Sequence, residues 1–463
     1  MASEGGGIFR RRFIPQILAT EVVNILKIFD GMHRGYVMHM LLSHYTYYKT
    51  DLGQFRATEE ILWIAPMFSL LAVPPIGKLF MDRFGRKLSF VVIYLASLLS
   101  WIFTLNSVDV FHLYLGMGFA GIARGGTSLV IPVFVAEICN PRIRGRLLTI
   151  STVNENIGLI AGFFGAFYGE KIAIIIAIAI LSIIFLGSLF FLYESPFFYF
   201  KKGKPGEAET SLKYYWNMKN YNNFREDDEF TDYRDNLRRK WDSGMYQYCI
   251  AGPSSAFTRA PKPSKKNIYL SLWMGSLPIF TGAYSFMNYL GNLKFREHEY
   301  KEDFTKGIIT IFILAIVGAK CSALIVDSVG RTSALKISAW LCTIILLFSY
   351  LLEFISFTYS MHEVDCVVMG LLAALAFSSN IGLTSAWSTV ALELPNDEQR
   401  LNAFCLSNGL SFFLEIIVAS LFPFLFKAYH FHGFMSVCLL LTIASLVFVK
   451  KIVPETQGKW LIN

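Results

Sequence analysis

Acidic and basic residues recur in two matching copies along the chain. Asp82-Arg83-Phe84-Gly85-Arg86 and Asp327-Ser328-Val329-Gly330-Arg331 share an Asp-x-x-Gly-Arg skeleton, and each follows a long apolar segment. Side chains of these types can pair with one another and can bind the ends of helices. We therefore expect Asp82 and Asp327 to accept hydrogen bonds from the amides of the helices that follow them. A charged turn that occurs twice between apolar stretches indicates an internal duplication.

A second pair of charges supports that duplication. Glu137 and Arg144 are seven residues apart, and Glu393 and Arg400 have the same separation at the matching place of the second half. Two repeated spacings in register are hard to produce by chance. They indicate two structurally equivalent halves, an arrangement typical of membrane transporters.

The sequence does not indicate reaction chemistry. It contains no nucleophile–base pair, metal-ligand cluster or phosphate-binding loop at a usable spacing, so we expect no enzyme activity, no cofactor and no metal. Seven cysteines are present, mostly inside predicted helices, and their spacing predicts neither a metal site nor a disulfide framework.

The composition is that of a membrane protein. Apolar residues make up 54% of the 463 positions and charged residues 16%, whereas an ordinary soluble domain has roughly 25% charged residues. The segment 172–193 carries no charge. As a helix it would be roughly 33 Å long, which is enough to cross a hydrocarbon core of roughly 30 Å.

The apolar segments predict an all-α membrane protein with twelve transmembrane helices in two six-helix bundles, because lipid cannot hydrogen-bond the backbone of open strands. We expect an N-terminal bundle in residues 1–200, a cytoplasmic linker with short helices in 201–265, and a C-terminal bundle with a cytoplasmic tail in 266–463. The predicted spans are 13–41, 60–80, 87–105, 110–139, 148–169, 171–193, 266–292, 304–326, 334–358, 363–393, 401–428 and 429–452.

Lysine and arginine gather in the N-terminal segment, in the loops after the second and fourth spans, in the linker and in the C-terminal tail. This distribution predicts that both termini and the linker are cytoplasmic. The formal net charge of +8 thus reflects the basic residues of the predicted cytoplasmic segments, and no nucleic-acid partner is expected. The basic N-terminus has no small-residue cleavage site, so no removable signal peptide is expected. We expect a monomeric multi-pass protein of the plasma membrane, whose partners are the lipid bilayer and a small-molecule substrate.

Four motifs occur in a fixed order along the chain. They are Gly77 to Lys87, Pro132 to Gly145, Tyr193-Glu194-Ser195-Pro196 and Pro454 to Lys459. Over nearly its full length the chain resembles the sugar porter branch of the major facilitator superfamily, and within it the insect facilitated trehalose transporter-like proteins. The resemblance implies a carrier whose two bundles rock about a central site.

The resemblance also implies that charges at the cytoplasmic ends of the helices form a latch, which holds the outward-facing state. Single exposed ion pairs contribute roughly 0–1 kcal/mol, but a clustered and partly desolvated network contributes more and suits a reversible two-state element. The alternative is that these charges only cap helices and set the topology. The latch residues are Asp82, Arg86, Glu137, Arg144, Glu194, Asp327, Arg331, Glu393, Arg400 and Glu455.

Charges inside the predicted spans form a further set, because each needs a partner or a water-lined cavity. Asp30 falls near the first-helix aspartate of proton-coupled sugar porters, but we favour an ion pair with Lys27, helped by Arg34 one turn on. Glu155 and Glu415 could face a cavity or pair with Arg124. The candidates for proton coupling are Asp30, Glu155 and Glu415.

A sugar site needs amide and indole groups that converge on hydroxyls. The resemblance implies such groups on the fifth, seventh, eighth and tenth helices, but most are replaced here, for example by Pro278, Ile279 and Ala315. These replacements favour a less polar solute or a weak, specialised sugar carrier over tight glucose binding. The candidate substrate-binding residues are Thr152, Asn156, Thr281, Tyr284, Asn288, Trp387 and Asn408.

Three functions are compatible with these observations. The first is a facilitative carrier of a sugar or sugar-like small solute that works by alternating access. The second is a non-transporting sugar sensor or receptor on the same scaffold. The third is a proton-coupled symporter of another small solute.

Overall fold

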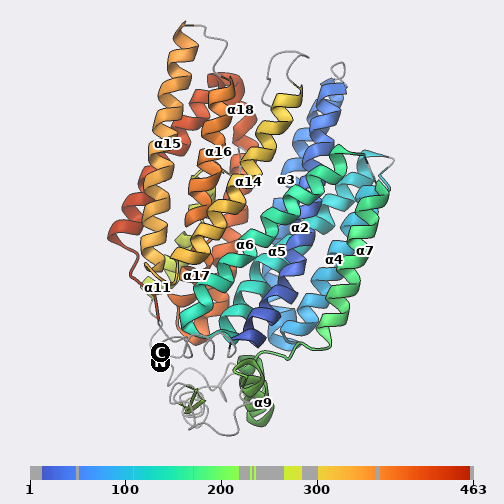
Figure 1. The fold of residues 1–463 in the computed structure, drawn as a ribbon, viewed down its shortest axis with the longest axis vertical. Coiled ribbons are helices and arrows are strands. Elements are labelled where there is room, and N and C mark those ends of the chain that lie inside the picture. The colour runs from blue at the N-terminus through green and yellow to red at the C-terminus, as the bar shows by residue number, and fades with distance from the viewer. Residues whose placement is uncertain are drawn as a thin grey trace, which may run out of the picture.

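The computed structural model describes residues 13–47, 52–107, 109–169, 171–217, 230–231, 234–235, 265–283, 301–359 and 365–458, and every regular element within them is a helix. The first helices of the chain lie on one side of the molecule and the last helices on the other (Figure 1). We call α2–α7 the N-terminal half and α11–α18 the C-terminal half. Tyr284 and Asn288, two of the predicted substrate-binding residues, lie outside the described residues.

The N-terminal half contains six long helical segments. α3 passes into a π-helical stretch, η1, directly after Pro74 and Pro75 and just before the first Asp-x-x-Gly-Arg turn. The helices are α2 (Ile14–Tyr47), α3 (Leu52–Pro75) with η1 (Ile76–Met81), α4 (Arg86–Leu105), α5 (Val110–Ile138), α6 (Pro141–Phe167) and α7 (Lys171–Leu189).

In the C-terminal half, two predicted spans are interrupted. The predicted span 266–292 begins as α11 (Lys265–Met274) and α12 (Leu277–Phe280), and the span 363–393 is divided into α16 (Asp365–Ile381) and α17 (Trp387–Glu393). The other helices are α14 (Lys301–Ile325), α15 (Arg331–Tyr359) and α18 (Asp397–Lys451).

The break between α16 and α17 is supported by hydroxyl groups. Ser338 Oγ donates to the Ser378 carbonyl at 2.6 Å and accepts from the Leu383 amide at 3.1 Å. Ser385 Oγ donates to the Asn380 carbonyl at 2.8 Å and contacts Ser322 Oγ. Backbone groups that the break frees are thus satisfied inside the protein, which is the condition for irregular backbone at membrane depth.

α18 contains two membrane passes. A straight helix of its 55 residues would be about 80 Å long, but both of its ends lie near Arg331. Near the start of α18, Arg400 Nε donates to the carbonyl of Leu392, and the next residue, Glu393, pairs with Arg331. Just after the end of α18, the Thr456 carbonyl accepts a hydrogen bond from Arg331. The chain therefore reverses within α18, between the apolar spans 399–421 and 433–451.

Nine helices in the described part of the chain are long and apolar enough to cross a membrane. Their burial follows their place in the bundle. α5 is almost entirely buried, whereas α7 exposes isoleucines such as Ile172, Ile176 and Ile183. Exposed isoleucines on an outer helix are expected where the surrounding solvent is lipid. The protein is thus an all-α, multi-pass membrane protein.

Glycines bring α2 and α6 together. A Cβ atom on Gly31 or Gly35 of α2 would collide with the backbone of α6, and one on Gly158 or Gly162 of α6 would collide with the backbone of α2. Small residues allow such close packing between membrane helices. The close approach places the charges of α2 beside Glu155 of α6.

Two short helices follow α7: α8 (Pro196–Lys201), just before the predicted linker, and α9 (Pro205–Tyr215), inside it. α9 lies beyond the ends of the long helices (Figure 1), and its Ser211 Oγ donates to the Glu194 carbonyl at 2.6 Å. We call this end of the molecule the linker end. It carries both Asp-x-x-Gly-Arg turns.

Candidate functional site

Arg86, the first residue of α4, forms a two-point ion pair with Glu137 of α5. Its Nε and Nη2 atoms donate to the two carboxylate oxygens at 2.9 and 2.6 Å, and Nη1 donates to the Met81 carbonyl at 3.1 Å. Both charged side chains are buried. The guanidinium also lies over the ring of Phe198 in α8, 5.6 Å from its centroid. The pair thus ties α4, α5 and α8 together.

Glu194 caps the N-terminus of α4. Its carboxylate accepts from the Arg86 amide at 2.9 Å and from the Lys87 amide at 3.0 Å. Gly85 precedes them with φ +95°, and a Cβ there would lie against this carboxylate. The expectation that Asp82 binds these amides is wrong. Asp82 instead accepts from Lys201 Nζ at 2.8 Å.

The C-terminal half repeats this arrangement. Arg331, the first residue of α15, pairs with Glu393. Glu455 accepts from the Arg331 amide at 3.0 Å and from the Thr332 amide at 3.1 Å, and it also binds the Thr332 hydroxyl. Gly330, with φ +108°, stands where Gly85 stands in the first half. Here too a glutamate from a distant segment, rather than the expected Asp327, caps the helix.

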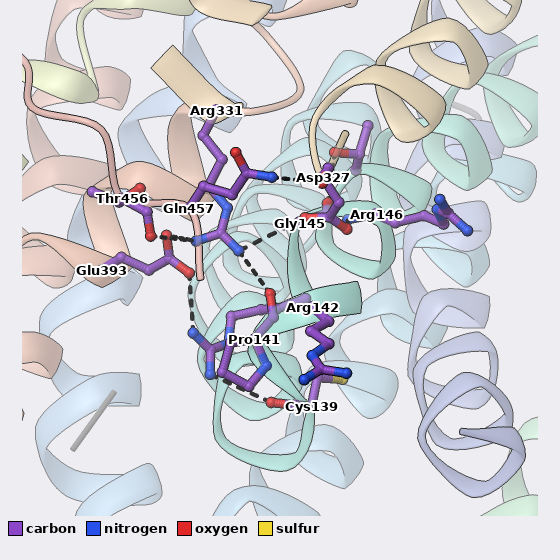
Figure 2. A network of polar contacts seen from close by, with 12 residues as sticks. Cys139, Pro141, Arg142, Gly145, Arg146, Asp327, Arg331, Glu393, Thr456 and Gln457 are labelled. Carbon is purple, nitrogen blue, oxygen red and sulfur yellow. Dashed lines mark hydrogen bonds and ion pairs between the residues drawn. The ribbon is translucent and has the colours of Figure 1, made fainter. Parts of the chain in front are cut away.

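Polar contacts at the linker end join the two halves (Figure 2). Arg144 Nη1 donates to Glu393 Oε1 at 3.0 Å, and both side chains are 1% exposed. Arg331 Nη2 donates to the Pro141 carbonyl at 3.1 Å. The Arg146 amide, in the second turn of α6, donates to Asp327 Oδ2 at 2.7 Å. Glu393 therefore binds one arginine from each half.

Two acids of this network, both outside the membrane-spanning segments, titrate differently from free side chains. Burial raises the pKa of Asp327, although the amides of Arg146 and Gly145 oppose the rise. Burial would also raise the pKa of Glu455, but the hydrogen bonds from Thr332 and from backbone amides outweigh it and lower that pKa. The hydrogen bonds to Glu455 thus favour its charged form.

Inside the membrane region, the charges of α2 pair with α6. Lys27 Nζ donates to Glu155 Oε2 at 3.1 Å, and Arg34 binds the other oxygen of Glu155. Arg34 also lies 3.5 Å from Asp30. The expected Lys27–Asp30 pair is therefore replaced by an Arg34–Asp30 pair, with Lys27 turned to Glu155.

Glu415 pairs with Arg124, which is one of the two alternatives left open by the sequence. The guanidinium donates to both carboxylate oxygens, at 2.9 and 3.0 Å. Arg124 lies on α5 and Glu415 on α18, so this ion pair also joins the two halves.

The described substrate-binding candidates lie in separate places. Asn408 Nδ2 donates to the Phe404 carbonyl at 3.0 Å, and the Phe404 ring stacks on Trp387 with centroids 5.9 Å apart. Asn156 reaches across to Asn380 of α16 at 3.4 Å. Thr281 is buried within its own turn, where it donates to the Pro278 carbonyl. Thr152 is half-buried on α6.

Sequence reasoning missed some members of these networks. Lys201, Thr332 and Asn380 each contact a predicted residue through a side chain that has an ordinary type and no repeated spacing. Thr332 alone had a usable signal, because it follows Arg331 at the start of a predicted helix, where hydroxyl side chains are common.

Comparisons with known proteins give one consistent family. The model for the family described as sugar (and other) transporter matches residues 17–463. The facilitated trehalose transporter Tret1 of Bombyx mori is 24% identical over 457 residues, which cover 96% of this chain and 85% of the relative. The sugar transporter ERD6-like 7 of Arabidopsis thaliana is 25% identical over 423 residues, which cover 89% and 84%.

Solved structures show the same fold. The proton:xylose symporter XylE bound to 6-bromo-6-deoxy-D-glucose superimposes with a TM-score of 0.76 at 17% identity, covering 97% of this chain and 98% of that one. The inward open conformation of XylE from E. coli gives a TM-score of 0.62 at 16% identity, covering 96% and 98%.

Proposed function

The chain belongs to the sugar transporter family of the major facilitator superfamily, and from this premise we propose that it carries a sugar or sugar-like small solute by facilitative alternating access. As a member of this family it is a transporter rather than an enzyme. The observation that carries the mechanism is the set of contacts between the halves at the linker end. These contacts join the two bundles at the end of the molecule where the linker lies.

The network at the linker end has the composition of a reversible latch. Hydrogen bonds to charged groups contribute about 1.5–3 kcal/mol each, and shifting a two-state equilibrium from 1:99 to 99:1 takes about 5.5 kcal/mol. The three contacts centred on Arg144, Arg331 and Asp327 are of that combined size. They would hold the linker end closed and still release it when a solute binds.

The remaining latch residues act within each half. Arg86 with Glu137, and Arg331 with Glu393, fix the first turns of α4 and α15. Lys201 holds Asp82, and Arg400 braces the chain between α17 and α18 through the Leu392 carbonyl. Each half would then move as a rigid body.

The pairing of the buried acids supports facilitative rather than proton-coupled transport. Asp30, Glu155 and Glu415 each lie against an arginine in the described conformation. Each carboxylate thus takes part in an ion pair within the protein, which supports a facilitative mechanism.

Part of the substrate site would form where the halves meet. Asn156 and Asn380 face each other from α6 and α16, and an amide offers two donors and one acceptor oxygen. Trp387 and Asn408 would line the C-terminal side and Thr152 the N-terminal side. Amides and an indole are groups that suit hydroxyl-rich solutes.

The distribution of lysine and arginine supports a proposed orientation of the protein in the membrane. We infer that the linker end faces the cytoplasm, with both termini on that side, and that the protein acts as a monomer in the plasma membrane. Impermeant labelling of engineered cysteines in intact cells tests the orientation. Reaction of a cysteine introduced in α9 without permeabilisation would contradict it.

Counterflow in proteoliposomes tests the transport function. Labelled glucose and trehalose should enter saturably and only down their gradients, and an imposed pH gradient should cause no accumulation. Absence of saturable flux, together with ligand binding, would instead assign a sensor function. Accumulation driven by the pH gradient would assign a proton-coupled symporter.

A further inference from the structure

An ion pair crosses between the two halves deep inside the membrane region. Arg124 stands fourteen residues from either end of α5, which places it roughly 21 Å from each end, near the middle of the membrane. Its partner Glu415 comes from α18, and the two side chains are only 12% and 6% exposed. The pair makes two parallel hydrogen bonds, at 2.9 and 3.0 Å.

Further polar groups surround this pair. The Arg124 guanidinium lies over the ring of Phe412, 5.3 Å from its centroid, and it also interacts electrostatically with Glu155. Asn156, the neighbour of Glu155, contacts Asn380 of the other half. The middle of the interface between the halves is thus charged.

Stable packing between α5 and α18 does not require an ion pair at Arg124 and Glu415. Replacing a buried ion pair with apolar side chains of similar volume is often neutral or stabilising, whereas removing one partner is strongly destabilising. Ionisable residues within membrane spans are by default candidates for functional groups. The position of the pair on two different halves adds a mechanical requirement.

Movement of the halves strains this ion pair. If α5 and α18 separate, each charge loses its partner in a medium that solvates it poorly. A neutral sugar could hydrogen-bond to both side chains but would compensate neither charge. A solute with one anionic and one cationic group would compensate both, because its carboxylate matches the guanidinium fork and its ammonium matches the carboxylate of Glu415.

We propose that Arg124 and Glu415 are the binding groups for a small zwitterionic solute, whose carboxylate replaces Glu415 on Arg124 and whose ammonium pairs with Glu415. This inference rests on the proposed alternating-access function, but it departs from a neutral sugar as the solute, because the two binding groups are charged. In the absence of the solute, the two side chains bind each other and hold the middle of the interface closed.

Binding to the purified full-length chain in nanodiscs tests the inference. The probes are glycine, β-alanine and γ-aminobutyrate as zwitterions of increasing charge separation, glucose and trehalose as neutral solutes, and propionate and propylamine as single charges. Isothermal titration should show saturable binding of at least one zwitterion, about tenfold tighter than any other probe, which corresponds to 1.4 kcal/mol.

Variants separate binding from folding. Arg124→Gln and Glu415→Gln should each weaken zwitterion binding about tenfold. The double variant R124L/E415L removes both charges and should stay folded yet not bind. The swap R124E/E415R restores a pair and should regain binding. The exposed pair Lys204–Glu207 provides the control, and K204Q/E207Q should leave binding unchanged.

Two results would overturn the inference. One is zwitterion binding that survives in R124L/E415L, and the other is a neutral sugar that binds best and equally well to the native chain and to that variant. Sugar counterflow in proteoliposomes made from the same purified protein would then still support the proposed transport function. Absence of binding and of flux for every probe would overturn both.

Discussion

Glu194 and Glu455 hold equivalent positions in the two halves, and each accepts the first two backbone amides of a helix that begins with an arginine. Each glutamate comes from the segment after the last long helix of its half. Each also accepts the amide of the residue that follows it, Ser195 or Thr456, at 2.9 and 3.0 Å. The duplication therefore extends to the atoms that cap α4 and α15.

Neutralising these caps should weaken both halves. Glu194→Gln and Glu455→Gln keep the side-chain shape but remove the negative charge at a helix N-terminus. We expect a loss of about 1–2 kcal/mol for each, seen as an apparent melting temperature lower by roughly 2–4 °C. Glu207→Gln is the matched control, because Glu207 is half exposed. An equal effect of all three variants would contradict the capping role.

Loss of Arg144 should open the linker end. Arg144→Ala removes the donor to Glu393 and with it one of the contacts that join the halves at the linker end, while Arg331 still balances the charge of Glu393. A cysteine at position 323, buried behind Arg146, should then react with maleimide about tenfold faster, as a shift of 1.4 kcal/mol would give. Unchanged reactivity would refute the latch.

Gly145→Ala should open the same end without removing a charge. A Cβ at Gly145 would collide with the Asp327 carboxylate, so this side chain would have to shift and would lose its hydrogen bond from the Arg146 amide. We expect faster labelling at position 323 and little change in expression. Gly187→Ala is the matched control, since no atom lies within 4 Å of its added Cβ. If both substitutions had the same effect, the contact with Asp327 would be irrelevant to closure.

The sequence predicted which charged residues form ion pairs at the linker end better than it predicted which residue each one pairs with. The repeated spacings identified Arg86, Glu137, Arg331 and Glu393, and the structure pairs each arginine with the glutamate of its own half. The spacings did not predict that Arg144 binds Glu393 of the other half. The two glutamates are equivalent in sequence, and only the relative position of the halves decides which arginine reaches them.

Contacts between distant residues were likewise outside the reach of sequence periodicity. The sequence offered the Arg124–Glu415 pair only as one of two alternatives, because these residues lie on helices whose apolar pattern is nearly uniform and no spacing marks the faces that meet. The helix break after Ile381 was also missed, because Ser338 and Ser322, which support it, belong to other helices. Gly382 alone is a weak signal for a break.

Asp30→Asn tests whether α2 carries a proton. Arg34 lies 3.5 Å from Asp30 but also binds Glu155, so the substitution leaves Arg34 with a partner. We expect solute uptake within about twofold of the native rate, a change of less than 0.5 kcal/mol, with the same lack of response to a pH gradient. Glu155→Gln removes the shared partner of Lys27 and Arg34 and should reduce uptake far more, because Arg34 keeps Asp30 but the buried Lys27 loses its carboxylate. The measurement is initial uptake into proteoliposomes at equal and at unequal pH. Accumulation of solute by the native chain under an inward proton gradient, abolished by Asp30→Asn, would show that Asp30 couples transport to protons and that the facilitative mechanism is wrong.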